Sequence, residues 1–460
     1  MCRIRVAELN PDATTHLRQP GFGDGLNPGG EMGRLFAERL ARIGSQNEFK
    51  IADDIARAEA MGMKVVRLNL GEPDNDSAAN INDCAIENIK SGNSHYCDPQ
   101  GLPAFRETIA RFVSDTRKVN VTPEQVLVTS GGKPSIPFTF LTYVNPGDEV
   151  IYPSPGFPAY EAWANYTGAV PRPIHLSEEL DYRFDATTLA PMVNRKTKLL
   201  IINSPSNPTG GVLTKEDLAG IARIMEEQAH PDYRIYSDEV YEEFVFDGND
   251  HHSIASQPGM MERTIIMNCH SKTFAMTGWR IGYAVLPTQE EAHALRLWSI
   301  NLYSCTPPFI QMAAKEALDN PINADITQTM KARFQKRRDI IVPLINAVDG
   351  MRCNMPGGAF YTFINVAEVC ERLGAVEFSA SHPEAPPPST LFQLFSLYKH
   401  GVATLDRSAF GALGSEDQHY LRISLASDSD ALKAGVTRLA EASTDVHGFQ
   451  EFLQQPELYR

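Results

Sequence analysis

Three groups that could do chemistry stand next to predicted secondary structure elements. Lys272 lies in the block SKTFAMTGWRIG at 271–282, and a lysine amine can form a Schiff base with a carbonyl compound when burial and cationic neighbours lower its pKa. Asp238 follows the end of a predicted strand, and α/β sheets bind ligands at the carboxyl ends of their strands. The loop SGGK at 130–133 follows another strand, and its backbone N–H groups favour a phosphate. These groups indicate a site for a small anionic ligand.

Three sequence blocks carry a resemblance to a known family. They are NSPSNPTG at 203–210, YSDEVYEEF at 236–244 and the block that contains Lys272. In this order they resemble class I and II aminotransferases of fold type I, in the branch similar to aspartate aminotransferase. The similarity is close over roughly residues 65–305 and weaker over 355–440. Three blocks at about thirty-residue spacing are far more specific than any one of them.

The resemblance implies pyridoxal 5′-phosphate as the cofactor. By it, Lys272 forms the Schiff base and later moves the proton between the substrate α-carbon and the cofactor C4′. Asp238 pairs with the pyridinium nitrogen, and its charge raises the pKa of that nitrogen and preserves the electron sink. Tyr241 and Asn207 share the ring 3′-oxygen. Arg280 holds the phosphate in a bidentate pair.

Further cofactor contacts follow from the same resemblance. Gly131, Gly132 and Lys133 form the phosphate loop. Phe157 in SPGFPAY occupies the place of an aromatic ring over the pyridine face, although a solitary aromatic residue is more often part of the core. Tyr96 in HYCDPQG matches a tyrosine that in the family reaches the phosphate of the neighbouring subunit. That match implies a homodimer with shared active sites.

Two residues are expected to hold the substrate carboxylate. Gly71 in NLGEPD resembles the glycine that lets the carboxylate approach, and Arg422 in YLRISLA resembles the arginine that binds it with two parallel hydrogen bonds. Lys133 bears on specificity, because a lysine at this position accompanies acidic substrates in the resembling branch. Its ammonium either meets a distal carboxylate or only neighbours the cofactor phosphate, and the sequence leaves both open.

The sequence departs from the family pattern at two places near the site. Cys269 stands where a serine or glycine is usual, and a thiol is a weak hydrogen-bond donor. His270 either bears on the pocket or packs behind the lysine, and we favour packing. Asp406 and Arg407 lie where many relatives carry a Pro-Gly turn. They either face the substrate or form a surface turn.

Alternation of short β-rich runs with helix-length segments positions these residues. The predicted strands of the first part are 65–70, 125–129, 149–153, 198–203, 233–237, 264–268 and 281–286, followed in a smaller α+β part by 358–366, 400–405 and 420–426. This order predicts an α/β fold with a mostly parallel sheet flanked by helices. We expect an N-terminal arm with part of the small domain at 1–64, a large cofactor-binding domain at 65–320 and a C-terminal small domain at 321–460.

Other segments have simpler interpretations. Residues 1–30 are rich in Gly and Pro and predict an extended arm, and a helical pattern follows at roughly 34–61. A second helix is expected at about 323–348, and its basic run is interpreted as a solvated face. The run consists of Lys331, Arg333, Lys336, Arg337 and Arg338. Residues 379–389 (SASHPEAPPPS) predict a Pro-rich surface loop.

Composition excludes several classes of partner. The formal net charge is −15 over 460 residues, which argues against nucleic acid or a membrane surface as the main partner. No apolar run approaches the length of a membrane span. The seven cysteines are scattered without a CxxC pair, so we expect neither a disulfide framework nor a metal site. The cytoplasm is the expected location.

Transamination between an L-amino acid and a 2-oxo acid is therefore the predicted function. The alternative is a specialised enzyme on the same fold that catalyses β- or γ-elimination, replacement, cyclisation or decarboxylation, since these reactions use the same cofactor residues. A binding protein on a degenerate fold is a third class. The sequence does not identify the natural amino donor.

Overall fold

Continuous apolar runs build the central sheet of the protein. In the computed structural model, which describes residues 36–43 and 47–459, seven strands pair in the order β2–β8–β7–β6–β5–β3–β4. Their bounds are β2 Val126–Thr129, β3 Glu149–Ser154, β4 Val170–His175, β5 Thr197–Asn203, β6 Arg234–Asp238, β7 Thr264–Cys269 and β8 Gly282–Val285. Strands β3 to β7 pair in parallel, whereas β8 is antiparallel to β2 and β7. The predicted mostly parallel sheet is confirmed.

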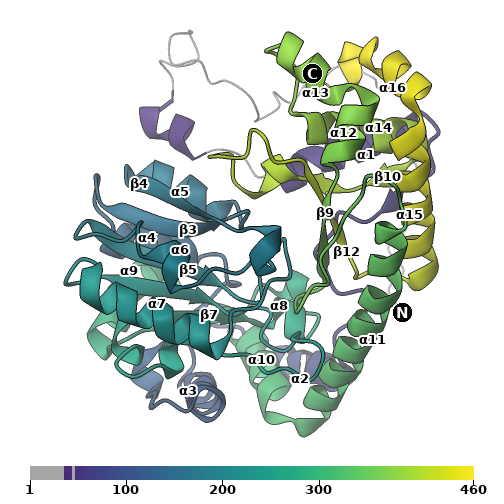
Figure 1. Ribbon diagram of the computed structural model, residues 1–460. Coiled ribbons are helices and arrows are strands. Elements are labelled where there is room, and N and C mark those ends of the chain that lie inside the picture. Colours follow the sequence, from purple (N-terminus) through teal and green to yellow (C-terminus); the bar gives the residue numbers. More distant parts are fainter. Residues whose placement is uncertain (1–35, 44–46, 460) are drawn as a thin grey trace. The chain divides into compact units, whose positions relative to one another are not determined.

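Helices cover both faces of this sheet because its strands are apolar on both sides (Figure 1). Alternate residues of β5 illustrate the division: Leu199 and Ile201 join one core cluster, and Leu200 and Ile202 join another. The first cluster includes α4 Ser135–Tyr143, α5 Ala159–Thr167 and α9 Gln289–Tyr303. The opposite face packs against α7 Lys215–Gln228, and against α2 Ala79–Lys90, α3 Pro103–Arg117 and α10 Pro308–Asp319.

A smaller antiparallel sheet carries the second set of site residues. It has the order β11–β12–β9, with β9 Tyr361–Asn365, β11 Leu405–Asp406 and β12 Tyr420–Ser424. A separate pair joins β1 Val66–Arg67 to β10 Val402–Ala403 in parallel. The surrounding helices are α1 Asn47–Ala60, α11 Pro321–Asn346, α12 Ala367–Leu373, α13 Ala375–Ser381, α14 Pro388–His400, α15 Ser429–Thr444 and α16 Val446–Leu453. Short helices elsewhere include α6 Ala186–Leu189 and α8 His270–Thr273.

Most predicted strands agree with the structure to within a few residues. The strand predicted at 65–70 shortens to β1, and the one predicted at 400–405 is wrong as a single strand, since the chain forms β10 and β11 instead. Sequence reasoning missed β4, which contains Pro171 and Pro173. It lies at the sheet edge beside β3, where proline is tolerated because a missing N–H breaks no ladder.

The basic run of α11 is only partly solvated, so its interpretation as one exposed face is wrong. Arg337 and Arg338 are buried. Arg337 Nη2 donates to Asp74 Oδ2 at 2.6 Å, and Arg338 donates to both carboxylate oxygens of Asp247. These two arginines therefore tie α11 to loops outside it, because a buried guanidinium requires paired partners.

The remaining expectations about segments have mixed outcomes. The predicted arm at 1–30 lies outside the described residues, and within 36–43 the chain forms a short 3₁₀ turn at Glu38–Arg42. The predicted loop at 379–389 shortens, because α13 ends at Ser381 and α14 begins at Pro388. From residue 46 onward the chain clusters as one unit, so the proposed domain boundaries stay a prediction. No helix among the described residues combines the length and apolar character that a membrane crossing requires.

Candidate active site

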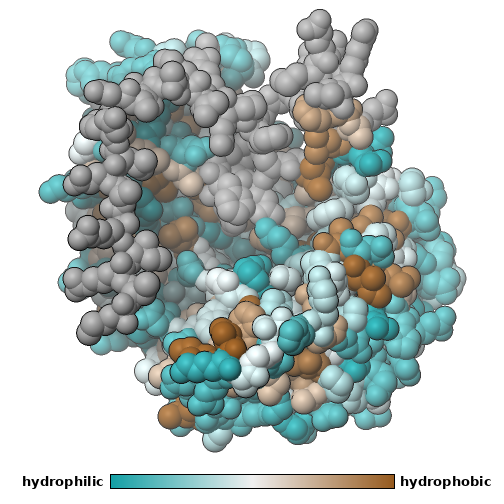
Figure 2. Space-filling view, turned by 180° about the vertical axis from the view of Figure 1, so that it is seen from behind, coloured by the Kyte–Doolittle hydropathy of each residue, from teal (hydrophilic) through white to brown (hydrophobic). Residues whose placement is uncertain are grey.

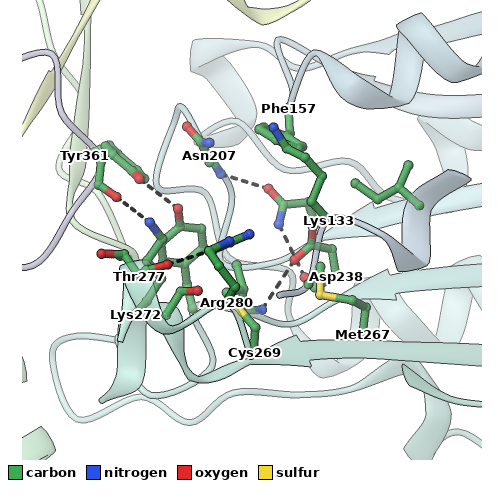
Figure 3. A pocket seen from close by; sticks show the side chains of 17 residues that line it. Lys133, Phe157, Asn207, Asp238, Met267, Cys269, Lys272, Thr277, Arg280 and Tyr361 are labelled. Atoms are coloured by element: carbon green, nitrogen blue, oxygen red, sulfur yellow. Dashed lines mark hydrogen bonds between the residues drawn. The ribbon is translucent and has the colours of Figure 1, made fainter. Parts of the chain in front are cut away.

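A cavity of about 230 Å³ lies where β5, β6 and β7 end. Nine of the twelve predicted site residues line it, and Figure 3 shows most of them: Gly71, Gly132, Lys133, Phe157, Asn207, Asp238, Tyr241, Lys272 and Arg280. Its walls also contain Ile136, Asn203, Val240, Met267, Cys269, Ser271, Thr277 and Tyr361. The carboxyl edge of the sheet thus brings together side chains from distant segments, as this architecture predicts.

Asp238 presents a buried carboxylate at the end of β6. Tyr160 of α5 donates a hydrogen bond to Oδ2 at 2.6 Å, and the Val240 N–H donates to Oδ1 at 3.4 Å. Burial raises the pKa of Asp238 to about 6, although the bond from Tyr160 opposes that rise. A carboxylate in such surroundings is stabilised by a cation placed beside it. The protonated ring nitrogen of the predicted cofactor is such a cation.

Lys272 lies in α8, directly after β7. Its Nζ donates a hydrogen bond to the carbonyl oxygen of Gly71, so the lysine points into the cavity toward the segment that follows β1. Gly71 cannot carry a side chain here, because a Cβ would overlap the hydroxyl of Tyr361. Three segments far apart in the sequence therefore meet at the lysine amine.

The predicted phosphate loop lies beside Arg280. Gly131 has a φ of +84°, and a Cβ on it would overlap the Arg280 guanidinium. This glycine does not line the cavity, but it lets the guanidinium approach the loop. Arg280 itself has a φ of +55°, a left-handed conformation that is uncommon for residues other than glycine, and its Nη1 donates to Thr277 O at 2.7 Å. A guanidinium beside glycine N–H groups is a suitable anion site.

Arg422 of β12 lies next to the cavity without lining it. Its Nη1 donates to Asn207 Oδ1 at 2.8 Å and its Nη2 donates to Asn69 O at 2.7 Å. The guanidinium carbon lies 4.4 Å from the ring centroid of Tyr361 and 4.9 Å from that of Phe410. The side chain is 1 % exposed, so these neutral oxygens and aromatic faces hold a buried cation. The planar guanidinium suits a carboxylate, which accepts two parallel hydrogen bonds from it.

Tyr361 is a lining residue that sequence reasoning missed. It begins β9, and its hydroxyl oxygen lies 2.7 Å from that of Tyr241. The signal available in the sequence was the strand at 358–366, which was predicted without its partner. Its pairing with β12 places Tyr361 opposite Ser424, two residues from Arg422. Long-range strand pairing was needed to bring it to the site.

Lys133 and Phe157 contact each other across one wall of the cavity. Lys133 Nζ lies 5.4 Å from the centroid of the Phe157 ring, and Phe157 packs edge-on against Tyr160 with centroids 5.8 Å apart. Phe157 thus lines the cavity and also joins the core. Its stacking on a cofactor ring stays a prediction. Tyr96 is 89 % exposed and does not reach this cavity.

His270 packs behind the lysine, as favoured from the sequence. It is buried, its Nε2 lies 3.0 Å from Ala314 O, and its ring contacts those of Phe105 and Phe274. Burial lowers the pKa of His270 to about 4, so the ring is neutral at pH 7 and donates to that carbonyl. Cys269 lines the cavity instead. Of these two departures, Cys269 is the one that faces the site.

For Asp406 and Arg407 both sequence interpretations, facing the substrate and forming a surface turn, are wrong. They neither line the cavity nor form a surface turn, because both are buried. Asp406 accepts hydrogen bonds from Thr390 and Ser408, whereas Arg407 Nη2 donates to Ser154 Oγ at 2.8 Å. Arg407 thereby links the small sheet to the end of β3, just before the segment that carries Phe157.

A buried ionic cluster lies behind Asp238 on the same strand exit. Arg117 donates to the carboxylate of Glu239 at 2.7 Å and also pairs with Glu242. His251 Nε2 lies 3.4 Å from Glu239 Oε2, and the ligand atoms of Glu239, Glu242 and His251 lie close enough together to hold a metal ion. Burial alone would raise the pKa of Glu239, but the charge of the Arg117 guanidinium, which pairs with both carboxylates, lowers it. The cluster therefore supports the strand exit through ion pairs.

The cavity residues fit pyridoxal 5′-phosphate. The cofactor presents a ring nitrogen, a 3′-oxygen, a carbonyl carbon and a phosphate. The site offers a buried acid for the nitrogen, a phenol for the 3′-oxygen, a lysine for the carbonyl carbon and an anion-binding loop for the phosphate. Glycines at 131 and 132 let Arg280 and Met267 approach the loop, since a Cβ on either would overlap one of these side chains, and Arg280 lines the cavity together with Gly132 and Lys133 of the loop. The donor set thus matches the cofactor group by group.

Comparison with known proteins gives the same result. Residues 63–439 match the family model described as aminotransferase class I and II. The chain is 35 % identical to an aspartate aminotransferase of Pyrococcus abyssi over 83 % of this chain and 92 % of the relative. It is 35 % identical to aromatic-amino-acid aminotransferase 2 of Thermococcus litoralis over 82 % and 90 %. The crystal structure of an aspartate aminotransferase from Rhizobium meliloti matches with a TM-score of 0.79 and 30 % identity, over 89 % of this chain and 98 % of that chain.

These matches confirm the predicted α/β fold of type I and the predicted enzyme class. They favour transamination over the specialised eliminations, replacements, cyclisations and decarboxylations that the sequence left open. They also confirm the cofactor, because aminotransferases of this family depend on pyridoxal 5′-phosphate. The chain therefore belongs to the class I and II aminotransferases and is a pyridoxal 5′-phosphate-dependent transferase.

Proposed function

We propose that this aminotransferase takes an acidic L-amino acid as its amino donor and a 2-oxo acid as its acceptor. The observation that carries the proposal is the Lys133 ammonium in the cavity wall, beside the ring of Phe157. A second carboxylate on the substrate would meet a cation there while its α-carboxylate meets Arg422. The relative from Pyrococcus abyssi bears the name aspartate aminotransferase, which agrees with this substrate class.

In this proposal each predicted residue acts on a stated atom. When bound, the cofactor supplies an electron sink for the bond that breaks at the substrate α-carbon. Lys272 holds the cofactor covalently in the resting enzyme and then moves the proton from the α-carbon to C4′. Asp238 keeps the pyridine nitrogen protonated. The closeness of the lysine to the Gly71 carbonyl sets its amine beside the segment where the substrate would enter.

The other residues bind and orient. Arg280 with the loop at 131–133 binds the phosphate, and Tyr241 with Asn207 donates to the 3′-oxygen. Arg422 binds the α-carboxylate, and Gly71, which lines the cavity, adds no side chain of its own to the approach. Asn207 connects the two subsites, because its Oδ1 accepts from Arg422 at 2.8 Å. Phe157 excludes water from one face of the ring.

Replacing Lys133 with alanine tests the substrate class. A charged hydrogen bond contributes about 1.5–3 kcal/mol, so kcat/KM for aspartate and glutamate should fall roughly 10- to 100-fold. The value for alanine or phenylalanine should change less than about threefold. Steady-state kinetics with the four amino donors measure both. An equal loss on acidic and neutral donors would mean that Lys133 serves the phosphate, and it would remove the support for an acidic substrate.

We also propose a homodimer in which Tyr96 reaches the phosphate of the neighbouring site. Support comes from the 89 % exposure of Tyr96 and from exposed apolar side chains on α9, namely Leu297, Ile300 and Leu302. Apolar areas interrupt the hydrophilic surface in Figure 2, and such areas often mark interfaces. The cytoplasmic location stays a prediction that rests on the scattered cysteines, of which the six described are free.

Hybrid dimers test the shared site. A Lys272→Ala subunit retains Tyr96, and a Tyr96→Ala subunit retains Lys272, so a mixed dimer contains one site with both residues. Refolding the two variants together should recover activity that neither shows alone, measured as rate per Tyr96→Ala subunit. If mixing recovers nothing although sedimentation shows mixed dimers, Tyr96 does not act across the interface. A monomeric wild-type protein would reject the homodimer itself.

A further inference from the structure

Tyr361 occupies a position between two parts of the proposed machinery. Its side chain is 1 % exposed, and its hydroxyl oxygen lies 2.7 Å from that of Tyr241. The same hydroxyl closes the space above Gly71, where a Cβ would overlap it. Its ring supports the Arg422 guanidinium at 4.4 Å. One side chain thus contacts the cofactor donor and the carboxylate-binding arginine together.

The direction of the hydroxyl contact follows from counting protons. A phenol has one proton to donate and can accept through its oxygen. In the proposed function the hydroxyl of Tyr241 donates its hydrogen bond to the 3′-oxygen of the cofactor. The oxygen of Tyr241 can then only accept, so the proton between the two tyrosines must come from Tyr361. Burial raises the pKa of Tyr241 far above its ordinary value, and Tyr361 adds to that rise. Tyr241 therefore stays a proton donor at neutral pH.

We infer that Tyr361 is a positioning residue for the reaction: its hydroxyl donates to Tyr241 and aims the Tyr241 proton at the cofactor 3′-oxygen, while its ring holds Arg422 in place. The inference rests on the role proposed for Tyr241. A donor that itself accepts a hydrogen bond is a stronger donor, because linked hydrogen bonds polarise one another. Tyr361 thus strengthens the bond from Tyr241 to the 3′-oxygen.

The fold explains why this residue can be rigid. Tyr361 starts β9, and the pairing of β9 with β12 sets it opposite Ser424 and sets Phe363 opposite Arg422. Its ring is also packed against Phe360 and Tyr241, with centroids 4.8 and 5.6 Å away. The small sheet therefore presents Tyr361 and Arg422 as one unit, while Tyr241 follows β6 of the central sheet. Tyr361 links the two sheets at the cofactor.

Tyr361→Phe removes the hydroxyl and keeps the ring. The first measurement is the pH titration of the absorbance of the cofactor bound in resting enzyme, without substrate. A weaker hydrogen bond at the 3′-oxygen stabilises negative charge on the ring less, so the protonated form persists to higher pH. The midpoint should rise by about 0.5–1 pH unit, the size expected for one neutral hydrogen bond. In kinetics, kcat should fall a few-fold, whereas KM for the amino donor should stay within about twofold.

Two further variants separate the hydroxyl from the ring and from a general structural effect. Tyr361→Leu also removes the aromatic face under Arg422, and KM should then rise roughly tenfold, as expected for the loss of a buried cation–π contact. Tyr420→Phe is the matched control. It removes a phenol hydroxyl from β12 that bonds to Glu178 at 2.6 Å outside the cavity lining, and its titration midpoint should equal that of wild type.

The outcomes are distinct. An unchanged or lower midpoint in a folded Tyr361→Phe protein overturns the inference, and so does an equal shift in Tyr420→Phe. A KM in Tyr361→Leu no higher than in Tyr361→Phe rejects the part played by the ring. Failure of the role proposed for Tyr241 would look different, because Tyr241→Phe would then itself leave the titration midpoint at the wild-type value.

Discussion

Replacing Lys272 with alanine should lower the rate of transamination by roughly four orders of magnitude or more, because one side chain has two tasks. It holds the cofactor covalently and moves the proton at the α-carbon. The described lining of the cavity contains one other lysine, Lys133, whose Nζ faces the ring of Phe157. That amine lies in a different wall from the one where Lys272 meets Gly71, so it should not replace the lost function.

Single-turnover absorbance with an amino donor measures this effect directly, since the cofactor band changes when the amino group is transferred. Lys336→Ala serves as the matched control, because Lys336 is exposed on α11 and alanine is a good helix former. The control should keep wild-type activity. A Lys272→Ala protein that retains more than about 1 % of the wild-type rate would be incompatible with the double role of this lysine.

Asp238→Asn should lower kcat by roughly 10²- to 5 × 10³-fold, with a small change in the affinity for amino donor. The substitution keeps the size of the side chain and an acceptor for Tyr160, but it removes the charge that stabilises the protonated ring nitrogen. Breaking a buried charge pair costs about 3–5 kcal/mol, which corresponds to this range of rates. Steady-state kinetics under saturating cofactor measure it. A fall of less than about threefold would show that the carboxylate does not face the ring nitrogen.

The same variant should be more stable than wild type when the cofactor is absent. Burial raises the pKa of Asp238 from 3.8 to about 6, so the folded protein binds this proton more tightly than the unfolded chain. The proton on Asp238 adds on the order of 3 kcal/mol to the free energy of unfolding of wild type. This contribution is fully present below about pH 4 and is lost as the pH rises through about 6. Asparagine has no such dependence.

Thermal melting of the two cofactor-free proteins at pH 4.5 and pH 7.5 tests this expectation. Between these pH values the melting temperature of wild type should fall relative to that of Asp238→Asn, because only wild type carries the buried carboxyl group. Other groups titrate in both proteins and cancel in the comparison. Equal pH dependence in the two proteins would contradict the raised pKa and the buried surroundings from which it arises.

The sequence predicted the central sheet well because its strands are short apolar runs buried on both faces. Strand β5 is an example, since its apolar residues fill two cores at once. Sequence reasoning missed β4, because the prolines at 171 and 173 argue against a strand unless its edge position is known. Residues at strand ends were also predictable. Asp238 and Lys272 stand directly after apolar runs, where parallel strands present their ligand-binding edge.

The positions of Tyr361, Asp406 and Arg407 could not be predicted, because they depend on contacts between distant segments that sequence patterns do not show. Tyr361 is brought to the site by the pairing of β9 with β12. Its hydroxyl then contacts that of Tyr241, which lies 120 residues earlier in the chain. Asp406 and Arg407 look like a surface pair in the sequence, since charged residues are seldom buried. They are buried because polar partners such as Thr390 and Ser154 come from separate elements. Partners of this kind become visible only when the chain is folded.

The most direct test of the central claim is to map where the cofactor is attached. The purified protein is incubated with pyridoxal 5′-phosphate, reduced with borohydride, digested and analysed by mass spectrometry. We predict one modified peptide, with the reduced cofactor on Lys272, and no stoichiometric label when Lys272 is replaced by alanine. Attachment at another lysine, or no attachment in the wild-type protein, would contradict the assignment of this cavity as the active site.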